Sequence, residues 1–204
     1  MAYIQPDRSA EKGCHVQEVY DRQTEAFGYL PNYAVLFSHR PAVIDLWAEL
    51  QRGLRRHVSS RLFELVTFAA AVELKSSYCA LAHGCKLRGF FSDAEIERLA
   101  GGEYEGVVEA DEAAAMHYAA AVAADASGVT EAHVAPMRAV GFSDREIFDV
   151  AGVAAGRAFF SKLVEGLGAL PDRAYLDLPE SFRSALEVGR ATESAEAAAP
   201  LQSG

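Results

Sequence analysis

The start and stop signals of helices constrain this chain more than any other feature of its sequence. Ser92-Asp93-Ala94-Glu95 and Ser143-Asp144-Arg145-Glu146 have the form of capping boxes, in which a serine caps a helix and a glutamate three residues later bonds back to it. Each box follows a glycine and one or two phenylalanines, a pattern typical of a helix end: Gly89-Phe90-Phe91 and Gly141-Phe142. This repeated sequence pattern indicates either two ordinary helix-to-helix turns or an internal helical duplication. Both interpretations predict a helix before and after each copy of the pattern.

No competing strand signal is present. Alanine is abundant, β-branched residues do not alternate with polar ones, and the chain has no Asn-Gly or Asp-Gly hairpin turn. We therefore expect an all-α fold, with a helix break at Arg40-Pro41 because a residue before proline avoids the helical region. The expected helices cover residues 14–27, 34–56, 60–75, 76–88, 109–125, 130–140, 144–167 and 179–188.

The composition is that of a globular protein with one domain. Half of the 204 residues are hydrophobic, and the mean hydropathy is +0.01. A single all-helical domain is expected over residues 1–189, with a motif-bearing core at about 58–125. Residues 190–204 are rich in Ala, Ser, Glu, Pro and Gly, and we expect them to form a disordered tail.

Charge and hydropathy disfavour several classes of partner. The net charge of −10 argues against a nucleic-acid partner, since phosphate contacts need clustered Lys and Arg. No apolar run reaches the ~18–20 residues of a membrane span, so no membrane partner is expected. Three cysteines form an odd set, and the amino terminus lacks a signal-peptide pattern. Both features favour a cytoplasmic location.

Candidate chemistry is concentrated at Ser76, Cys79 and His83. On a helix, steps of three and four residues place these side chains on one face, and Cys79 is adjacent to His83. An imidazole beside a thiol can accept its proton or hold the thiolate as an ion pair, which nucleophilic sulfur chemistry needs. The spacing alone also fits a buried structural cysteine beside a hydrogen-bonded histidine, which is the commoner case.

The segment is similar to the signature of the alkylhydroperoxidase D-like branch of the carboxymuconolactone decarboxylase family. That signature is a glutamate followed twelve residues later by Cys-x-x-Cys-x-x-x-His. Glu64 takes the glutamate position, Ser76 that of the first cysteine, Cys79 that of the second, and His83 that of the histidine. Tyr78 precedes the cysteine and is a candidate pocket-lining residue. The resemblance covers about residues 16–175 and includes the segments 27–32, 39–41, 141–147 and 159–163.

The resemblance implies an all-α alkylhydroperoxidase D-like helical bundle that forms a homo-oligomer, commonly a trimer or a hexamer. In the redox members, the second cysteine is expected to attack the peroxide and the first to close a disulfide. The hydroxyl of Ser76 cannot form that disulfide. Cys85 lies six residues after Cys79, about 9 Å along a helix, which is beyond disulfide range. Cys14 cannot be placed from the sequence.

Three functional hypotheses remain. In the first, the chain is a peroxidase, an antioxidant oxidoreductase: Cys79 is the single nucleophile, Glu64 and His83 relay its proton, and an external thiol reduces the sulfenate. In the second, Glu64 and His83 serve non-redox acid–base chemistry of the decarboxylase, lyase or isomerase type. In the third, the protein is a non-catalytic family member. The expected substrate is a hydroperoxide or a small organic acid. The sequence indicates no cofactor and no metal site, since no second close Cys or His pair is visible.

Overall fold

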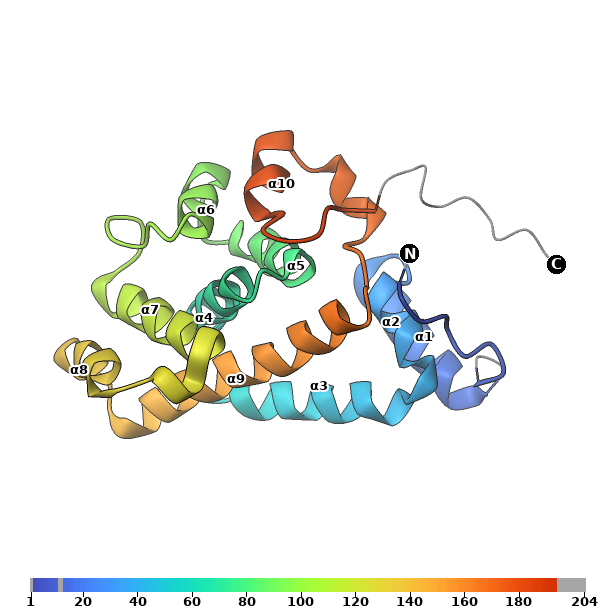
Figure 1. The fold of residues 1–204 in the computed structure, drawn as a ribbon, viewed down its shortest axis with the longest axis horizontal. Helices are drawn as coiled ribbons and strands as arrows, with labels where there is room; N and C mark the ends of the chain where they lie inside the picture. The colour runs from blue at the N-terminus through green and yellow to red at the C-terminus, as the bar shows by residue number, and fades with distance from the viewer. Residues whose placement is uncertain (1, 11–12, 194–204) are drawn as a thin grey trace.

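The computed structural model describes residues 2–10 and 13–193, which form a bundle of α-helices with short 3₁₀ helices between them (Figure 1). No strand occurs in the described residues, and none of their helices is long and apolar enough to cross a lipid bilayer. The elements are α1 (Cys14–Phe27), α2 (Asn32–Leu36), η2 (Phe37–His39), α3 (Pro41–Arg55), α4 (Ser60–Glu73), α5 (Ser77–Leu87), α6 (Asp93–Ala100), α7 (Ala110–Asp125), η3 (Ala126–Gly128), α8 (Glu131–Ala139), α9 (Asp144–Gly166), η4 (Arg173–Asp177) and α10 (Glu180–Leu186).

Most helix ends coincide with the local signals in the sequence. α1 ends at Gly28, whose φ of 78° lies in the left-handed region that glycine adopts without strain. Ser59 caps α4 by accepting a hydrogen bond from the backbone N–H of Leu62. Both capping boxes are present, at Ser92 before α6 and at Ser143 before α9. These predicted boundaries are confirmed.

The helix expected over residues 34–56 is divided into separate elements. α2 begins earlier than expected, at Asn32, directly after Pro31, and continues into η2. Arg40 has a non-helical backbone, with φ of −152° and ψ of 72°, and α3 starts at Pro41. The predicted break at this dipeptide is confirmed, because the fixed φ of proline suits the first position of a helix and disfavours helix at the residue before it.

α4 is the central helix of the bundle. It packs against α5, α7 and α9, and its nine consecutive residues from Phe63 to Ala71 are all buried. A helix that is buried on every side has to be surrounded by other elements. Figure 1 shows α4 and α5 in the middle of the bundle, with α7 beside them, α9 and α3 beneath, and α6 and α10 above. Side chains of α9 reach the beginning of α5, and this crossing positions the site described below.

Residues 190–193 differ from the expected tail because they pack against the body of the protein. Nη1 of Arg190 donates a hydrogen bond of 2.8 Å to the carboxylate of Glu165, and Nη2 donates one to the hydroxyl of Tyr3. Thr192 is buried. The ion pair between Arg190 and Glu165 holds this segment against α9, and the composition of the segment does not predict this contact. The remainder of the expected tail, residues 194–204, lies outside the described residues.

Candidate active site

A buried carboxylate–imidazole pair joins α4 to α5. The side chains of Glu64 and His83 are 5% and 6% exposed, and Nδ1 of His83 is 2.5 Å from Oε2 of Glu64. The other carboxylate oxygen of Glu64 faces two cations, Arg55 at 3.5 Å and Lys86 at 3.9 Å. The structure thus brings two of the residues in the sequence motif into direct contact.

The surroundings of this pair keep the carboxylate charged and the imidazole neutral. Burial, reinforced by the positive charge of Arg157, lowers the pKa of His83 to about 3. Burial acts in the opposite direction on Glu64, but the hydrogen bond from His83 and the nearby positive charges outweigh it, so the pKa of Glu64 lies below its ordinary value. Nδ1–H of His83 therefore donates to Glu64, which leaves Nε2 unprotonated, with its lone pair free to accept a hydrogen bond.

Cys79 is buried on α5, one turn before His83, and its sulfur receives two hydrogen bonds from α9. Nη1 of Arg157 lies 3.4 Å from Sγ, and Oγ of Ser161 lies 3.2 Å from it. A cationic donor and a hydroxyl donor both stabilise a thiolate. Sequence reasoning did not identify Arg157 or Ser161 as site residues. The available signal was that two polar residues four apart occupy the buried face of α9, among apolar neighbours.

Ser76 lies directly before the first residue of α5 and is fully buried. Its hydroxyl donates a hydrogen bond of 2.9 Å to Oε1 of Glu165 on α9. The carboxylate of Glu165 is also the partner of Arg190. Ser76 is not among the residues that line the pocket of Cys79, and no hydrogen bond joins the two side chains in the described structure. The hydrogen bond from Ser76 thus connects the start of α5 to α9.

Cys79 and His83 face a pocket of about 200 Å³ whose walls are largely aromatic. Tyr78, the candidate pocket-lining residue, is one of the residues that line it. Trp47 is buried and also lines the pocket. The lining residues are Phe27, Tyr33, Trp47, Gln51, Arg55, Phe63, Tyr78, Cys79, Ala82, His83, Lys86, Arg157, Phe160, Asp172 and Tyr175.

A second buried carboxyl group, Asp172, also lines the pocket. It accepts a hydrogen bond of 2.7 Å from the backbone N–H of Asn32 and one of 3.1 Å from the hydroxyl of Tyr29. Burial raises the pKa of Asp172, although these hydrogen bonds act in the opposite direction. The pocket therefore contains an imidazole that its surroundings keep neutral and a carboxyl group whose surroundings favour its protonated form.

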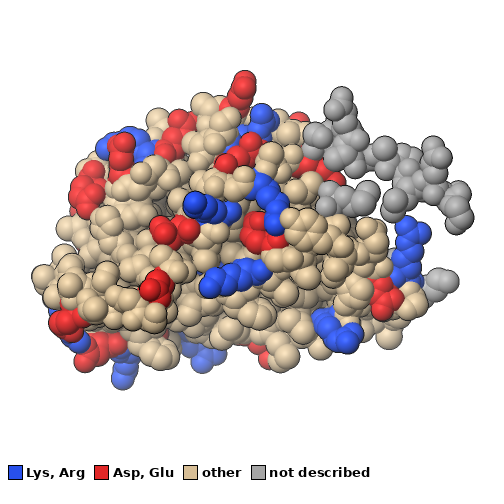
Figure 2. All heavy atoms as spheres, in the orientation of Figure 1, with Lys and Arg blue, Asp and Glu red and all other residues tan. Residues whose placement is uncertain are grey.

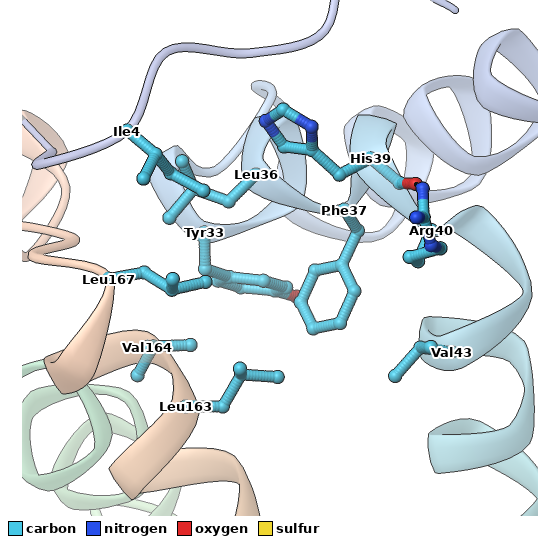
Figure 3. Close-up of a pocket in the computed structure, with 10 residues that line it drawn as sticks. All are labelled: Ile4, Tyr33, Leu36, Phe37, His39, Arg40, Val43, Leu163, Val164 and Leu167. Carbon is cyan, nitrogen blue, oxygen red and sulfur yellow. Dashed lines mark hydrogen bonds between the residues drawn. The ribbon is translucent and has the colours of Figure 1, made fainter.

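A second cavity, of about 250 Å³, adjoins the first through Tyr33, which lines both. Figure 3 shows aliphatic side chains from the end of α9 facing the rings of Tyr33 and Phe37. His39 lies at the edge of this cavity, where its Nε2 is 2.7 Å from the backbone carbonyl oxygen of Gln5. The cavity presents mainly apolar surface, which suits a hydrocarbon group.

The described residues contain no cluster of three or more His, Cys, Asp or Glu arranged to hold a metal ion. All three cysteines are free: Cys14 is exposed, Cys79 is buried, and Cys85 is partly buried on α5. Burial raises the pKa of the Cys85 thiol. On the face of the molecule drawn in Figure 2, acidic and basic side chains are interspersed.

No protein-family model matches the sequence, and no curated protein does. Solved structures do resemble it. An alkylhydroperoxidase AhpD core, an uncharacterized peroxidase-related protein from Ralstonia eutropha JMP134, is 20% identical with a TM-score of 0.70 and covers 92% of this chain and 97% of its own. A peroxidase-related protein from Silicibacter sp. TM1040 is 19% identical with a TM-score of 0.65, covering 79% and 86%.

The debrominase Bmp8, whose C82A variant was solved in complex with 2,3,4-tribromopyrrole, matches this chain over the same extent as the Ralstonia protein does. Its apo structure is 15% identical to this chain with a TM-score of 0.67, covering 92% of this chain and 97% of its own. At such identities the likeness defines the architecture rather than the activity. The chain has the all-α fold of the alkylhydroperoxidase AhpD core.

Proposed function

We propose that the chain is an alkylhydroperoxidase-like thiol peroxidase with a single cysteine nucleophile, Cys79. The environment of its sulfur carries the proposal, because Arg157 and Ser161 donate hydrogen bonds to it from α9 and the neutral His83 follows it by one turn. The thiolate is the reactive form of cysteine, and cationic and hydroxyl donors stabilise it. The peroxidase-related proteins that share this fold support the same assignment.

The first step is a proton transfer along the buried relay. Nε2 of His83 accepts the thiol proton of Cys79, and the carboxylate of Glu64 stabilises the resulting imidazolium through Nδ1–H. The thiolate attacks the outer oxygen of a hydroperoxide, R–O–OH. An S–O bond forms, the O–O bond breaks, and Cys79 becomes a sulfenic acid. The alkoxide, RO⁻, takes the proton from the imidazolium and leaves as the alcohol.

The second half of the cycle requires an external thiol. Ser76 stands where a resolving cysteine would be needed, and its hydroxyl is bonded to Glu165. A first thiol, R′SH, attacks the sulfenic sulfur, forms a mixed disulfide with Cys79 and releases water. A second R′SH attacks the mixed disulfide, forms R′S–SR′ and returns the thiol of Cys79. Two equivalents of thiol are therefore consumed for each hydroperoxide.

Non-redox acid–base chemistry on a small organic acid is a second candidate. The observation that favours it is the pairing of His83, held neutral by burial, with Asp172, whose pKa burial raises, in one pocket. In such a reaction, of the decarboxylase, lyase or isomerase type, Nε2 of His83 would remove a proton from the substrate and Asp172 would return one. Cys79 would then contribute packing rather than chemistry.

Turnover of cumene hydroperoxide with a small thiol as reductant tests the proposal. Cys79→Ser is expected to abolish turnover, whereas Cys85→Ser, a matched change on the same helix, should retain it. Glu64→Gln keeps the shape of the relay but removes its charge, and the rate is expected to fall by about 10²–10⁴. Turnover by Cys79→Ser at the parental rate would refute the thiol mechanism and leave the acid–base candidate.

A further inference from the structure

Arg157 is a buried cation with no carboxylate partner in the described part of the chain. Only 6% of the residue is exposed. Its Nη1 donates to the sulfur of Cys79, and its Nε has no hydrogen-bond partner. The guanidinium lies over two aromatic rings, 5.7 Å from the centre of Trp47 and 5.4 Å from that of Phe160. Burying a charge without an anion is costly, so this position favours an added negative charge.

The charges around the pocket do not cancel. Arg55, Lys86 and Arg157 line it, whereas the neighbouring carboxylates are Glu64 and Asp172. Glu64 faces the first two cations, and Asp172 is occupied by hydrogen bonds from Asn32 and Tyr29. While Cys79 is in its thiol form, Arg157 is thus left with the excess positive charge, although the whole chain has a net charge of −10. A confined cationic spot attracts anions more strongly than an exposed one does.

Aromatic rings form much of the wall of this pocket. The rings of Trp47 and Phe160 are stacked, with centroids 5.2 Å apart and planes at 20° to one another. Tyr33 meets Phe160 edge-on at 5.3 Å, and Tyr78 also lines the pocket. Aromatic walls of this kind bind a flat ring by stacking and edge contacts. A volume of about 200 Å³ suits a single ring rather than a drug-sized molecule.

We propose that this pocket is a binding site for small aromatic carboxylates, with the carboxylate at Arg157 and the ring between the aromatic walls. Guanidinium groups bind carboxylates through paired N–H donors, and Arg157 has donors to spare. The site goes beyond the proposed peroxidase activity and does not require Cys79 to react. It does have a consequence for Cys79, because the bound carboxylate and the sulfur share one guanidinium and one pocket. Occupancy therefore shields the thiol from reagents.

The fluorescence of Trp47, the only tryptophan in the chain, reports occupancy directly. We would titrate the protein with benzoate, with the uncharged analogue benzamide, and with cyclohexanecarboxylate, which keeps the charge but not the aromatic ring. Benzoate is expected to bind at least about 30-fold more tightly than benzamide, since a buried charge pair is lost with the amide. Cyclohexanecarboxylate is expected to bind about 2–10-fold more weakly than benzoate, because it lacks ring contacts.

Variants on α9 locate the anion. Arg157→Gln should abolish the preference for benzoate over benzamide, whereas Lys162→Gln, which removes an exposed charge from the same helix, should preserve it. Circular dichroism of both variants checks that the bundle is intact. Equal binding of benzoate and benzamide by the parent, or an unchanged preference in a folded Arg157→Gln variant, would overturn the inference.

A second measurement uses a chain whose pocket is unaltered and so does not depend on the folding of the arginine variant. In a Cys14→Ser, Cys85→Ser background, benzoate is expected to slow alkylation of Cys79 by iodoacetamide, and benzamide at the same concentration is not. Equal rates with both compounds would contradict the inference. Neither measurement contains a hydroperoxide, so loss of the peroxidase proposal leaves this one standing, and failure to bind benzoate leaves the peroxidase proposal standing.

Discussion

Acidification should destabilise this protein between pH 7 and pH 5 because of His83. The fold buries the neutral imidazole and lowers its pKa to about 3, whereas a histidine in an unfolded chain has its ordinary value of 6.5. As the pH falls below 6.5, the unfolded state takes up a proton that the folded state does not bind. The free energy of unfolding therefore decreases as the pH falls, and the decrease ends near the folded pKa.

The expected size follows from the difference between the two pKa values. Between pH 7 and pH 5, proton binding stabilises the unfolded state relative to the folded state over nearly one and a half pH units. At 1.36 kcal/mol per unit, the free energy of unfolding therefore falls by about 2 kcal/mol. The lowered pKa of Glu64 acts with the same sign, but mainly below its ordinary value of 4.5. The interval from pH 7 to pH 5 thus isolates the imidazole from its carboxylate partner.

Urea unfolding at several pH values measures this contribution. His83→Gln keeps an N–H donor for Glu64 but cannot titrate, so its stability should fall by about 2 kcal/mol less than that of the parent between pH 7 and pH 5. His117→Gln, which removes an exposed histidine bonded to Glu105, serves as the matched control and should follow the parent. If His83→Gln and the parent lose the same amount, the imidazole is not held neutral and the proposed proton relay loses its base.

Three further changes test the packing of α5 against α10, the cap of α9 and the start of α5. Gly84→Ala places a methyl group 2.2 Å from Cδ2 of the fully buried Leu186, and it should lower the free energy of urea unfolding by about 1–3 kcal/mol; an unchanged midpoint would contradict this contact between α5 and α10. Ser143→Ala removes the cap of α9 and should cost about 1 kcal/mol in the same assay, and no loss would mean that the cap is dispensable. Ser76→Cys should form a disulfide with Cys79 on mild oxidation, since residues three apart at a helix start have Cα atoms about 5–6 Å apart; non-reducing peptide maps without the cross-linked peptide would refute that geometry.

The parts of the fold that local signals specify could be predicted from the sequence. The bounds of α1 and the caps of α6 and α9 depend on one or two residues next to each helix end. The contact of Glu64 with His83 was accessible through a motif in which both residues lie within one short segment. Such features need no knowledge of how distant helices pack.

The remaining features depend on tertiary packing. Arg157 and Ser161 are far from Cys79 in the chain, and only the crossing of α9 over the start of α5 brings them to the sulfur. The sequence placed Ser76 on the same helical face as Cys79 and His83, but it did not identify Glu165 as its partner. Glu165 lies on α9 and accepts a hydrogen bond from the Ser76 hydroxyl. Residues 190–193 were assigned by composition to a tail, but Arg190 finds a partly buried carboxylate. No local pattern identifies these partners.

The central claim is that Cys79 is a nucleophile toward hydroperoxides. Mass spectrometry of peptides after treatment with one equivalent of hydroperoxide, with a trap for sulfenic acid, tests it most directly. We predict stoichiometric labelling of Cys79, with Cys14 and Cys85 unlabelled, and loss of labelling in Arg157→Gln, which removes the cationic donor to the sulfur. A thiol of Cys79 that stays unoxidised, or equal oxidation of all three cysteines, would contradict the claim.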